Sequence, residues 1–129
     1  MQTTITPTTD NVTTVRRFFE AWTDCDVDSL VTLVDPNVVC EPLLGVLYQR
    51  DFYEGLEGIA GAFREVDQRW HRYELLVEDA QPAGDHVIAH VRLDVGKHGM
   101  AAALDLMVVC RMRRGRIISL SEAAVALAA

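Results

Sequence analysis

The 129-residue chain has few cysteines, and none of them suggests a framework. Cys25, Cys40 and Cys110 are odd in number and far apart, so the sequence indicates free thiols rather than disulfides or a metal-ligand cluster. The four histidines, at positions 71, 86, 90 and 98, also lack the paired helical spacing of a zinc site. We therefore expect no metal and no other cofactor.

Long apolar runs and an excess of basic charge are also missing. No apolar stretch approaches the roughly 20 residues that a membrane-spanning helix needs, and the opening residues MQTTITPTTD lack the basic and apolar segments of a secretory signal. Nineteen acidic residues against twelve basic ones give a formal net charge of -7, which would repel phosphate backbones. We expect a cytoplasmic protein with neither a membrane nor a nucleic acid as its partner.

The length and composition describe one soluble globular domain. The chain is 50% hydrophobic and 24% charged, and at this size folding removes roughly two-thirds of the unfolded surface from water. The threonine-rich start has little to bury. Residues 1–9 are therefore predicted to be a flexible tail, and residues 10–129 a single domain.

Hydrophobic spacing in the first half of the chain predicts helices. Apolar residues recur at helical intervals in three segments, and capping or helix-breaking residues flank the first two. The predicted helices are Asp10–Asp24, with Asp10 as the cap, Asp26–Pro36, closed by Asp35 and Pro36, and Leu56–Asp67.

The rest of the chain is predicted to be strands. Short strands are expected at Val38–Glu41 and near Val46–Tyr48, and the strings PAGD, GKHG and RRG separate four longer ones. Short connections make antiparallel neighbours. The long strands are expected at Trp70–Ala80, His86–Val95, Ala101–Arg113 and Arg116–Ala124. The predicted fold is α+β, with a curved antiparallel or mixed sheet wrapped around three N-terminal helices to form an open-ended, cystatin-like cone.

The predicted strand around Ala89–Asp94 carries an unusual charged row. His90, Arg92 and Asp94 share one of its faces, while valine, alanine and leucine occupy the other. The charged row either faces water, as in ordinary antiparallel alternation, or points into a cavity where Arg92 and Asp94 bind and polarise a small molecule. Our site hypothesis uses the second alternative.

Glu122 lies in the last predicted strand, on its apolar side. Ile118, Leu120, Glu122 and Ala124 share one face by alternation. An isolated ionised carboxylate there would cost several kcal/mol, so it would take up a proton or pair with a cation, for which Arg92 is the nearest candidate. The alternative is a frayed strand end in solvent. Asp105, opposite Leu104 and Leu106, is expected to face solvent or an interface.

Aromatic side chains are candidates for the walls of a cavity, because a cone of this kind buries some of them in its base and leaves others around the opening. The tyrosine hydroxyls could also donate to a developing oxyanion. The expected ligand is a small, largely apolar molecule with one or two oxygens. The candidate ligand contacts are Phe18, Trp22, Tyr48, Tyr53, Phe63, Trp70 and His90.

Several strings resemble the nuclear transport factor 2-like superfamily. VRRFFEAWTDCDVDSLVTLVDPNVVCEP is similar to its opening, FYEGLEGIAGAF to its third helix, and GDHVIAHVRLDVGKHG with CRMRRGRIISLSEA to its long strands. The resemblance covers roughly residues 12–124. The superfamily includes SnoaL-like polyketide cyclases, steroid delta-isomerases, limonene-type epoxide hydrolases and non-catalytic domains, so it implies the cone fold more strongly than a reaction.

The resemblance also implies roles for individual residues. Glu41 lies where the isomerases have a general-base aspartate followed by proline. Arg92 and Asp94 match the Arg-x-Asp pair of the hydrolases, and Glu122 lies where the cyclases have their acid–base aspartate. Two family residues are absent, because Val39 stands near the hydrolases' tyrosine and Val108 near the isomerases' proton donor.

Three functions follow from these observations. The first is a cofactor-independent acid–base enzyme of cyclase or isomerase type, with Glu122 as the acid–base group and Glu41 as the second. The second is epoxide opening, in which Asp94 activates water, Glu122 protonates the leaving oxygen and Arg92 bridges the two. The third is a binding or association domain whose pocket is closed by side chains.

The long strands are apolar on both faces, as Leu104 and Leu106 against Met107 and Val109 illustrate. One apolar face of the sheet packs against the helices, and the apolar residues of the other face are left uncovered. A surface of this kind would be a liability on a monomer. A homodimer through the sheet is therefore predicted.

Overall fold

A computed structural model describes residues 7–41 and 53–128, with side chains from residue 11 onward. In this part of the chain, helices precede a meander of four long strands. The elements are α1 (Pro7–Thr23), a 3-10 turn (Val27–Ser29), α2 (Leu30–Leu33), β1 (Val34–Cys40), β2 (Tyr53–Glu54), α3 (Gly55–Arg69), β3 (Arg72–Ala83), β4 (His86–Lys97), β5 (Met100–Arg113) and β6 (Arg116–Leu127).

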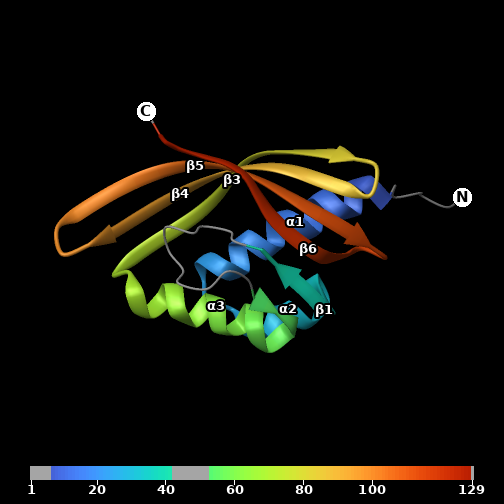
Figure 1. Ribbon diagram of the computed structural model, residues 1–129, viewed down its shortest axis with the longest axis horizontal. Helices are drawn as coiled ribbons and strands as arrows, with labels where there is room; N and C mark the ends of the chain where they lie inside the picture. The colour runs from blue at the N-terminus through green and yellow to red at the C-terminus, as the bar shows by residue number, and fades with distance from the viewer. Residues whose placement is uncertain (1–6, 42–52, 129) are drawn as a thin grey trace, which may run out of the picture.

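The sheet is open and mixed. Its strand order is β2-β1-β6-β5-β4-β3, so β2 and β3 form the two edges. The pairing of β1 with β6 is parallel, and all other neighbours are antiparallel. The long strands arch over the helices, with α1 between the sheet and α3 (Figure 1). The predicted fold class, a curved sheet wrapped around N-terminal helices, is confirmed.

Two predicted boundaries in the first half are wrong. α1 begins at Pro7 rather than at Asp10, because proline fits the first helical turn, where its missing N–H is not needed. α2 ends at Leu33, so Asp35 and Pro36 lie inside β1 instead of closing a helix. The ladder between β1 and β6 shifts register after Val34, and such an irregularity tolerates a proline that has no N–H to donate.

The predicted short strand near Val46–Tyr48 lies outside the described residues. The predicted meander is confirmed, since β3 to β6 pair in chain order. The last two hairpins have two-residue turns, His98-Gly99 and Arg114-Gly115, in which all four residues have positive φ, from 51° to 79°. This is the backbone of a type I′ turn, whose twist matches that of the flanking strands.

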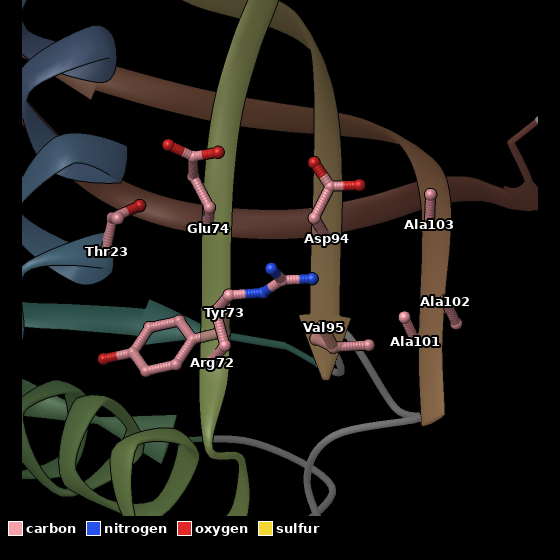
Figure 2. Close-up of a pocket in the computed structure, with 9 residues that line it drawn as sticks. All are labelled: Thr23, Arg72, Tyr73, Glu74, Asp94, Val95, Ala101, Ala102 and Ala103. Carbon is pink, nitrogen blue, oxygen red and sulfur yellow. The ribbon is translucent and has the colours of Figure 1, made fainter. Parts of the chain in front are cut away.

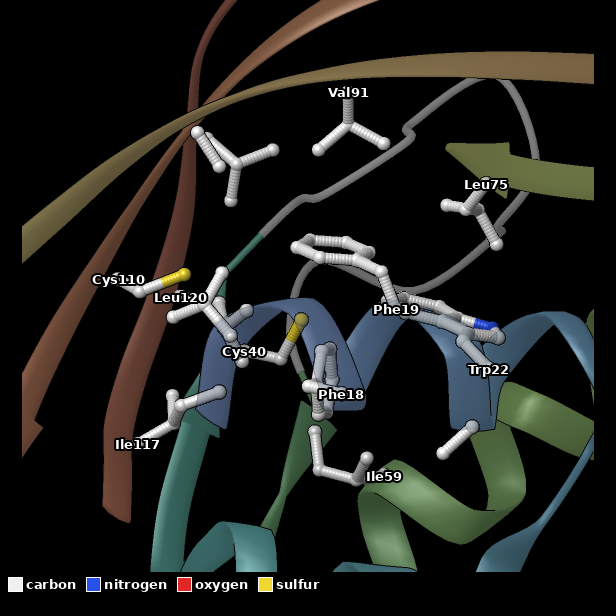
Figure 3. Close-up of a cluster of buried hydrophobic side chains, with 14 of the residues drawn as sticks. Phe18, Phe19, Trp22, Cys40, Ile59, Leu75, Val91, Cys110, Ile117 and Leu120 are labelled. Atoms are coloured by element: carbon white, nitrogen blue, oxygen red, sulfur yellow. The ribbon is translucent and has the colours of Figure 1, made fainter. Parts of the chain in front are cut away.

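The core lies between the helices and the inner face of the sheet. Val87, Val91 and Leu93 of β4 are fully buried, and α1 packs Phe19 towards this face while Phe18 points towards Ile59 of α3 (Figure 3). The rings of Phe18 and Phe63 contact edge to face with centroids 5.7 Å apart, which joins α1 to α3. These contacts fix the helices under the arch of the sheet.

Two of the three cysteines belong to this core. Cys40 of β1 and Cys110 of β5 both pair with Leu120 of β6. The three side chains therefore lie side by side across the sheet. Burial raises the pKa of Cys40 to about 12, and it raises the pKa of Cys110 as well. Cys25 is half-buried, and its pKa is raised by burial and by the Asp67 carboxylate. All three thiols are free.

This difference in burial predicts the order of thiol labelling. At pH 8 iodoacetamide should modify Cys25 slowly and faster as pH rises, because a raised pKa leaves the thiol protonated near neutrality. Cys40 and Cys110 should react only after unfolding in urea. Mass spectrometry of tryptic peptides measures all three sites, and fast native labelling of Cys40 or Cys110 would contradict the described packing.

None of the helices within the described ranges is long and apolar enough to cross a membrane.

Candidate functional site

Glu122 lies on the inner face of β6. Its partner across the ladder is Val108 of β5, and two residues earlier Leu120 pairs with Cys110. Val108, Cys110 and Leu120 are all fully buried, whereas Glu122 is half-buried. Paired residues in a sheet share a face. The prediction that Glu122 shares the core-facing side with Leu120 is therefore confirmed.

The alternative of a frayed strand end is wrong, because β6 continues to Leu127 and stays paired with β5 beyond Glu122. Along the inner face, exposure rises from 0% at Leu120 to 43% at Val125 and 79% at Leu127. Glu122 therefore lies at the boundary between the packed core and an open apolar stretch of the concave surface.

Two bulges decide which residues of β6 join Glu122 on this face. The β5–β6 register shifts between Arg111 and Met112 and again between Met107 and Val108, which leaves Ile118 and Ala123 as extra residues. Ile117 and Val125 consequently take the inward positions that simple alternation assigns to Ile118 and Ala124. The predicted face is correct for Leu120 and Glu122 and wrong for the other two, because a bulge changes the alternation.

Glu41 follows the end of β1, beside the same part of β6. Its backbone N–H donates to the Leu120 carbonyl oxygen at 2.9 Å, and its side chain is exposed. Cys40 is in register with Leu120, and both are fully buried on the inner face. The structure thus brings the backbone of Glu41 beside β6, and a shared site of the Glu41 and Glu122 carboxylates stays a prediction.

The charged row of β4 faces outward. His90, Arg92 and Asp94 alternate with the buried residues Ala89, Val91, Leu93 and Val95. Arg92 Nε lies 3.2 Å from Asp94 Oδ1, and His90 Nε2 lies 3.0 Å from Asp105 Oδ1. The prediction that this row points into the cone is wrong, and ordinary antiparallel alternation explains it. Asp105 lies on the outer face, as expected.

This orientation separates Arg92 from Glu122. The two side chains lie on opposite faces of the sheet, and β5 runs between their strands. The prediction that Arg92 is the cation nearest to Glu122 is therefore wrong. The same geometry removes the hydrolase-like arrangement in which Arg92 bridges Asp94 and Glu122.

The predicted aromatic contacts fall into three groups. Phe18, Trp22 and Phe63 are fully buried and contact one another's rings, so they form the base of the core. Trp70 is half-buried, and its indole N–H is buried without a hydrogen-bond partner among the described residues. Tyr48 lies outside the described residues. Ligand contacts by these side chains stay a prediction.

Tyr53 has a partner that the sequence did not indicate. Its side chain is buried, and its hydroxyl donates to Glu65 Oε2 of α3 at 2.9 Å. The hydroxyl hydrogen is therefore engaged by a carboxylate in this structure and does not point to an oxyanion. Glu65 lies twelve residues after Tyr53, and only the reversal from β2 into α3 brings the two together. No sequence spacing signals such a pair.

A separate hollow of about 570 Å³ lies at the end of β3 and β4 (Figure 2). Arg72 extends from β3 towards β4, and its guanidinium lies close to Gly96. A Cβ atom added to Gly96 would lie 3.7 Å from Arg72 Nε. Glu74 and Asp94 present carboxylates beside it, so the acidic groups outnumber the one guanidinium. This hollow is distinct from the inner face that carries Glu122.

Tyr73 and Thr23 border the same hollow but are already engaged. The Tyr73 hydroxyl donates to the Trp22 carbonyl oxygen at 3.2 Å. The pKa of Tyr73 is raised mainly by burial and also by the nearby Asp67 carboxylate. The Thr23 hydroxyl accepts from the Leu75 N–H at 2.9 Å, which ties the end of α1 to the edge strand. Both groups hold the fold at this corner.

Within the described residues, no group of three or more His, Cys, Asp or Glu side chains is placed to hold a metal ion.

Comparison with known proteins relates both the sequence and the fold to others. A family model described as a SnoaL-like domain matches residues 15–120. A search of curated proteins finds no significant match.

Among solved structures, Bal32a from a soil-derived mobile gene cassette has a TM-score of 0.80 at 22% identity, covering 91% of this chain and 90% of that one. A putative SnoaL-like polyketide cyclase from Jannaschia sp. CCS1 has a TM-score of 0.75 at 19% identity, covering 95% and 90%. An LEH-like epoxide hydrolase from M. tuberculosis has a TM-score of 0.73 at 17% identity, covering 91% and 84%. At these identities the likeness concerns the fold.

Proposed function

Because the chain belongs to the SnoaL-like domain family, we propose that it is a cofactor-independent acid–base enzyme of cyclase or isomerase type. The observation that carries the proposal is the place of Glu122, a half-buried carboxylate on the apolar inner face of the sheet where the packed core opens. The proposed substrate is a small, largely apolar molecule with one or two oxygens.

In the proposed reaction, the Glu122 carboxylate removes a proton from the carbon next to a substrate carbonyl. In an isomerase, the resulting enolate takes this proton back from Glu122 at another carbon. In a cyclase, the enolate carbon bonds to a second carbonyl carbon of the same molecule, and the alkoxide oxygen formed takes the proton from Glu122. A positioned side chain that transfers a proton in this way typically accelerates the step by about 10² to 10⁴. Glu41, directly after the end of β1, is the proposed second acid–base group.

The apolar stretch beyond Glu122 supports the proposed substrate class. Val125 and Leu127 face the same side of the sheet and are exposed, while Leu106 next to them on β5 is fully buried. An apolar molecule that covers these side chains would remove their surface from water, at about 25 cal/mol per Å². Its carbonyl-bearing end would then lie near Glu122.

Epoxide opening is less well supported by the described geometry. The outward Arg92 and Asp94 pair cannot supply the water-activating and bridging groups of that hypothesis on the inner face. Among the predicted catalytic residues that the structure describes, Glu122 is the one that pairs with a buried residue of this face.

Deuterium exchange tests the proposal directly. The purified protein is incubated in D2O with a panel of small cyclic and polyketide-like ketones and with matched epoxides, and the products are followed by NMR. We expect deuterium at the carbon next to a ketone, or a cyclised or isomerised product, from at least one ketone. Diol formation from epoxides alone, or binding of ketones without exchange, would contradict the acid–base assignment.

We also propose that two copies associate through the outer face of the sheet. Met107 is 37% exposed on this face, and the alanines of β6 that face the same side, Ala124 and Ala126, are exposed as well. Beside them, the Arg92–Asp94 pair carries charges of both signs, and His90 Nε2 lies 3.0 Å from Asp105 Oδ1. A two-fold axis would place this mixed surface against its own copy, which suits a self-complementary interface.

Light scattering coupled to size exclusion tests this association. We expect twice the 14.4 kDa mass of one chain at micromolar concentration. Met107→Glu should reduce the mass towards that of a monomer, because it puts a charge on the proposed interface. Leu127→Glu, a similar change on the inner face, is the matched control and should leave the mass unchanged. A monomeric wild-type protein would contradict the proposal.

A further inference from the structure

The hairpin between β5 and β6 concentrates basic charge in an acidic protein. Four of the twelve lysines and arginines lie between positions 111 and 116, although the chain has a net charge of -7. Arg113, Arg114 and Arg116, which we call the arginine hairpin, surround the turn at Gly115. Clustered like charges repel one another. Their concentration at one end of the molecule would favour the binding of an anion there.

The arginine hairpin borders a hollow of about 660 Å³ beside the first residues of β1. The pairing of Val34 with Ile117 brings β1 alongside β6 at this end of the sheet. The lining therefore combines two segments far apart in the sequence. Its other members are Asp35, Asn37 and Ile118.

The three guanidinium groups have no ionic partner within the described ranges. Arg111, just outside the hollow, pairs with Asp85 at 3.8 Å, but no carboxylate lies within 4.0 Å of the nitrogens of the arginine hairpin. Asp35 is the one acidic group in the lining, and its Oδ1 accepts the Asn37 N–H at 2.8 Å. Three cations against one engaged carboxylate leave the hollow with a net charge of +2.

The backbone adds a second observation. Arg114 has a φ of 54°, at the first position of a type I′ turn. Asparagine, aspartate and glycine are the residues that favour this position. Arginine lacks this preference, as does His98 at the same position of the preceding hairpin. The turn thus holds a long basic side chain at the border of the hollow.

We propose that the arginine hairpin binds a ligand with a diphosphate group. Guanidinium groups form paired, charge-assisted hydrogen bonds with phosphate oxygens, and the net charge of +2 suits a ligand with two adjacent anionic groups better than a single one. Asn37 adds a polar group, and Ile118 provides an apolar edge for the rest of the ligand.

This site is separate from the proposed acid–base site. Arg116 and Glu122 are six residues apart on β6, which corresponds to about 20 Å along an extended strand. Binding at the hairpin is therefore independent of catalysis by Glu122, and either proposal can fail alone.

Titration calorimetry with pyrophosphate, at constant ionic strength, tests the proposal with the full chain. We expect binding in the sub-millimolar range. Arg113→Gln, Arg114→Asn and Arg116→Gln should each weaken it by about tenfold, because each removes charge-assisted hydrogen bonds. Arg114→Asn preserves the turn, so its effect would not come from unfolding. Arg111→Gln is the matched control and should leave affinity within about twofold, since this guanidinium lies outside the hollow.

Two further titrations, with ADP and with orthophosphate, identify the ligand class. ADP should bind at least as tightly as pyrophosphate and should shift the NMR signals of Asn37 and of residues 113–118, whereas orthophosphate should bind more weakly. Equal affinity for orthophosphate would overturn the diphosphate assignment. Absent binding, or a loss in Arg111→Gln as large as in the hairpin variants, would overturn the site itself, because the latter result would reflect overall charge.

Discussion

Replacing Glu122 with Gln should lower turnover of a ketone substrate by about 10² or more while the fold stays intact. Glutamine keeps the shape of the side chain and much of its hydrogen bonding, but it cannot accept the substrate proton. Because Glu122 lies at the edge of the packed core rather than inside it, the change should alter the melting temperature little. Steady-state kinetics and circular dichroism of the variant measure the two effects.

Ser121→Ala is the matched control for this variant. Ser121 is the preceding residue of β6, pairs with Val109 and faces the outer side of the sheet, so its loss should leave turnover unchanged. Glu41→Gln should reduce turnover by a smaller factor if Glu41 is the second acid–base group. A Glu122→Gln protein with a lower melting temperature but full activity per folded molecule would make Glu122 structural, and the catalytic role would then have to move to Glu41.

The largest effect on stability is expected at Phe18. This fully buried ring contacts Phe19, Trp22 and Phe63, with centroids 5.3, 5.6 and 5.7 Å away. Phe18→Ala should lower the free energy of unfolding by about 3 to 5 kcal/mol, because it removes apolar contacts and leaves a cavity between α1 and α3. Urea unfolding followed by tryptophan fluorescence measures this change.

Phe18→Leu is the corresponding control, since it retains most of the apolar volume and should cost less than half as much. The same pair of variants separates two interpretations of this aromatic residue. If Phe18 forms the base of the core, stability falls and the KM for substrate changes little in the Leu variant. A Phe18→Ala protein of nearly wild-type stability but with weakened substrate binding would instead identify Phe18 as a wall of the ligand cavity.

The elements of the fold were predictable because their signals are local. The apolar spacing of residues 56–67 predicted a helix, and the structure has α3 at Gly55–Arg69. The strings GKHG and RRG predicted turns, and both hairpins use them. Period-two alternation also separated the buried valines of β4 from its charged residues. The alternation alone did not determine whether the valines or the charged residues of β4 face the helices.

The composition of the candidate site was less accessible. Glu122 was placed correctly because it follows Leu120 on an unbroken stretch of β6. Its neighbours were not, since the extra residues Ile118 and Ala123 break the alternation on either side. A bulge depends on how two strands pair, and a single strand carries no periodic signal for it.

By itself, the sequence determined the order of helices and strands, the antiparallel meander and the inward position of Glu122, because each rests on residues close together in the chain. Only the tertiary structure decided that Arg92 and Asp94 face outward, that Glu65 accepts from Tyr53, and that the arginine hairpin meets β1. These relations join segments far apart in the sequence. They are set by the curvature of the sheet and by which of its faces the helices cover, and local patterns do not encode either.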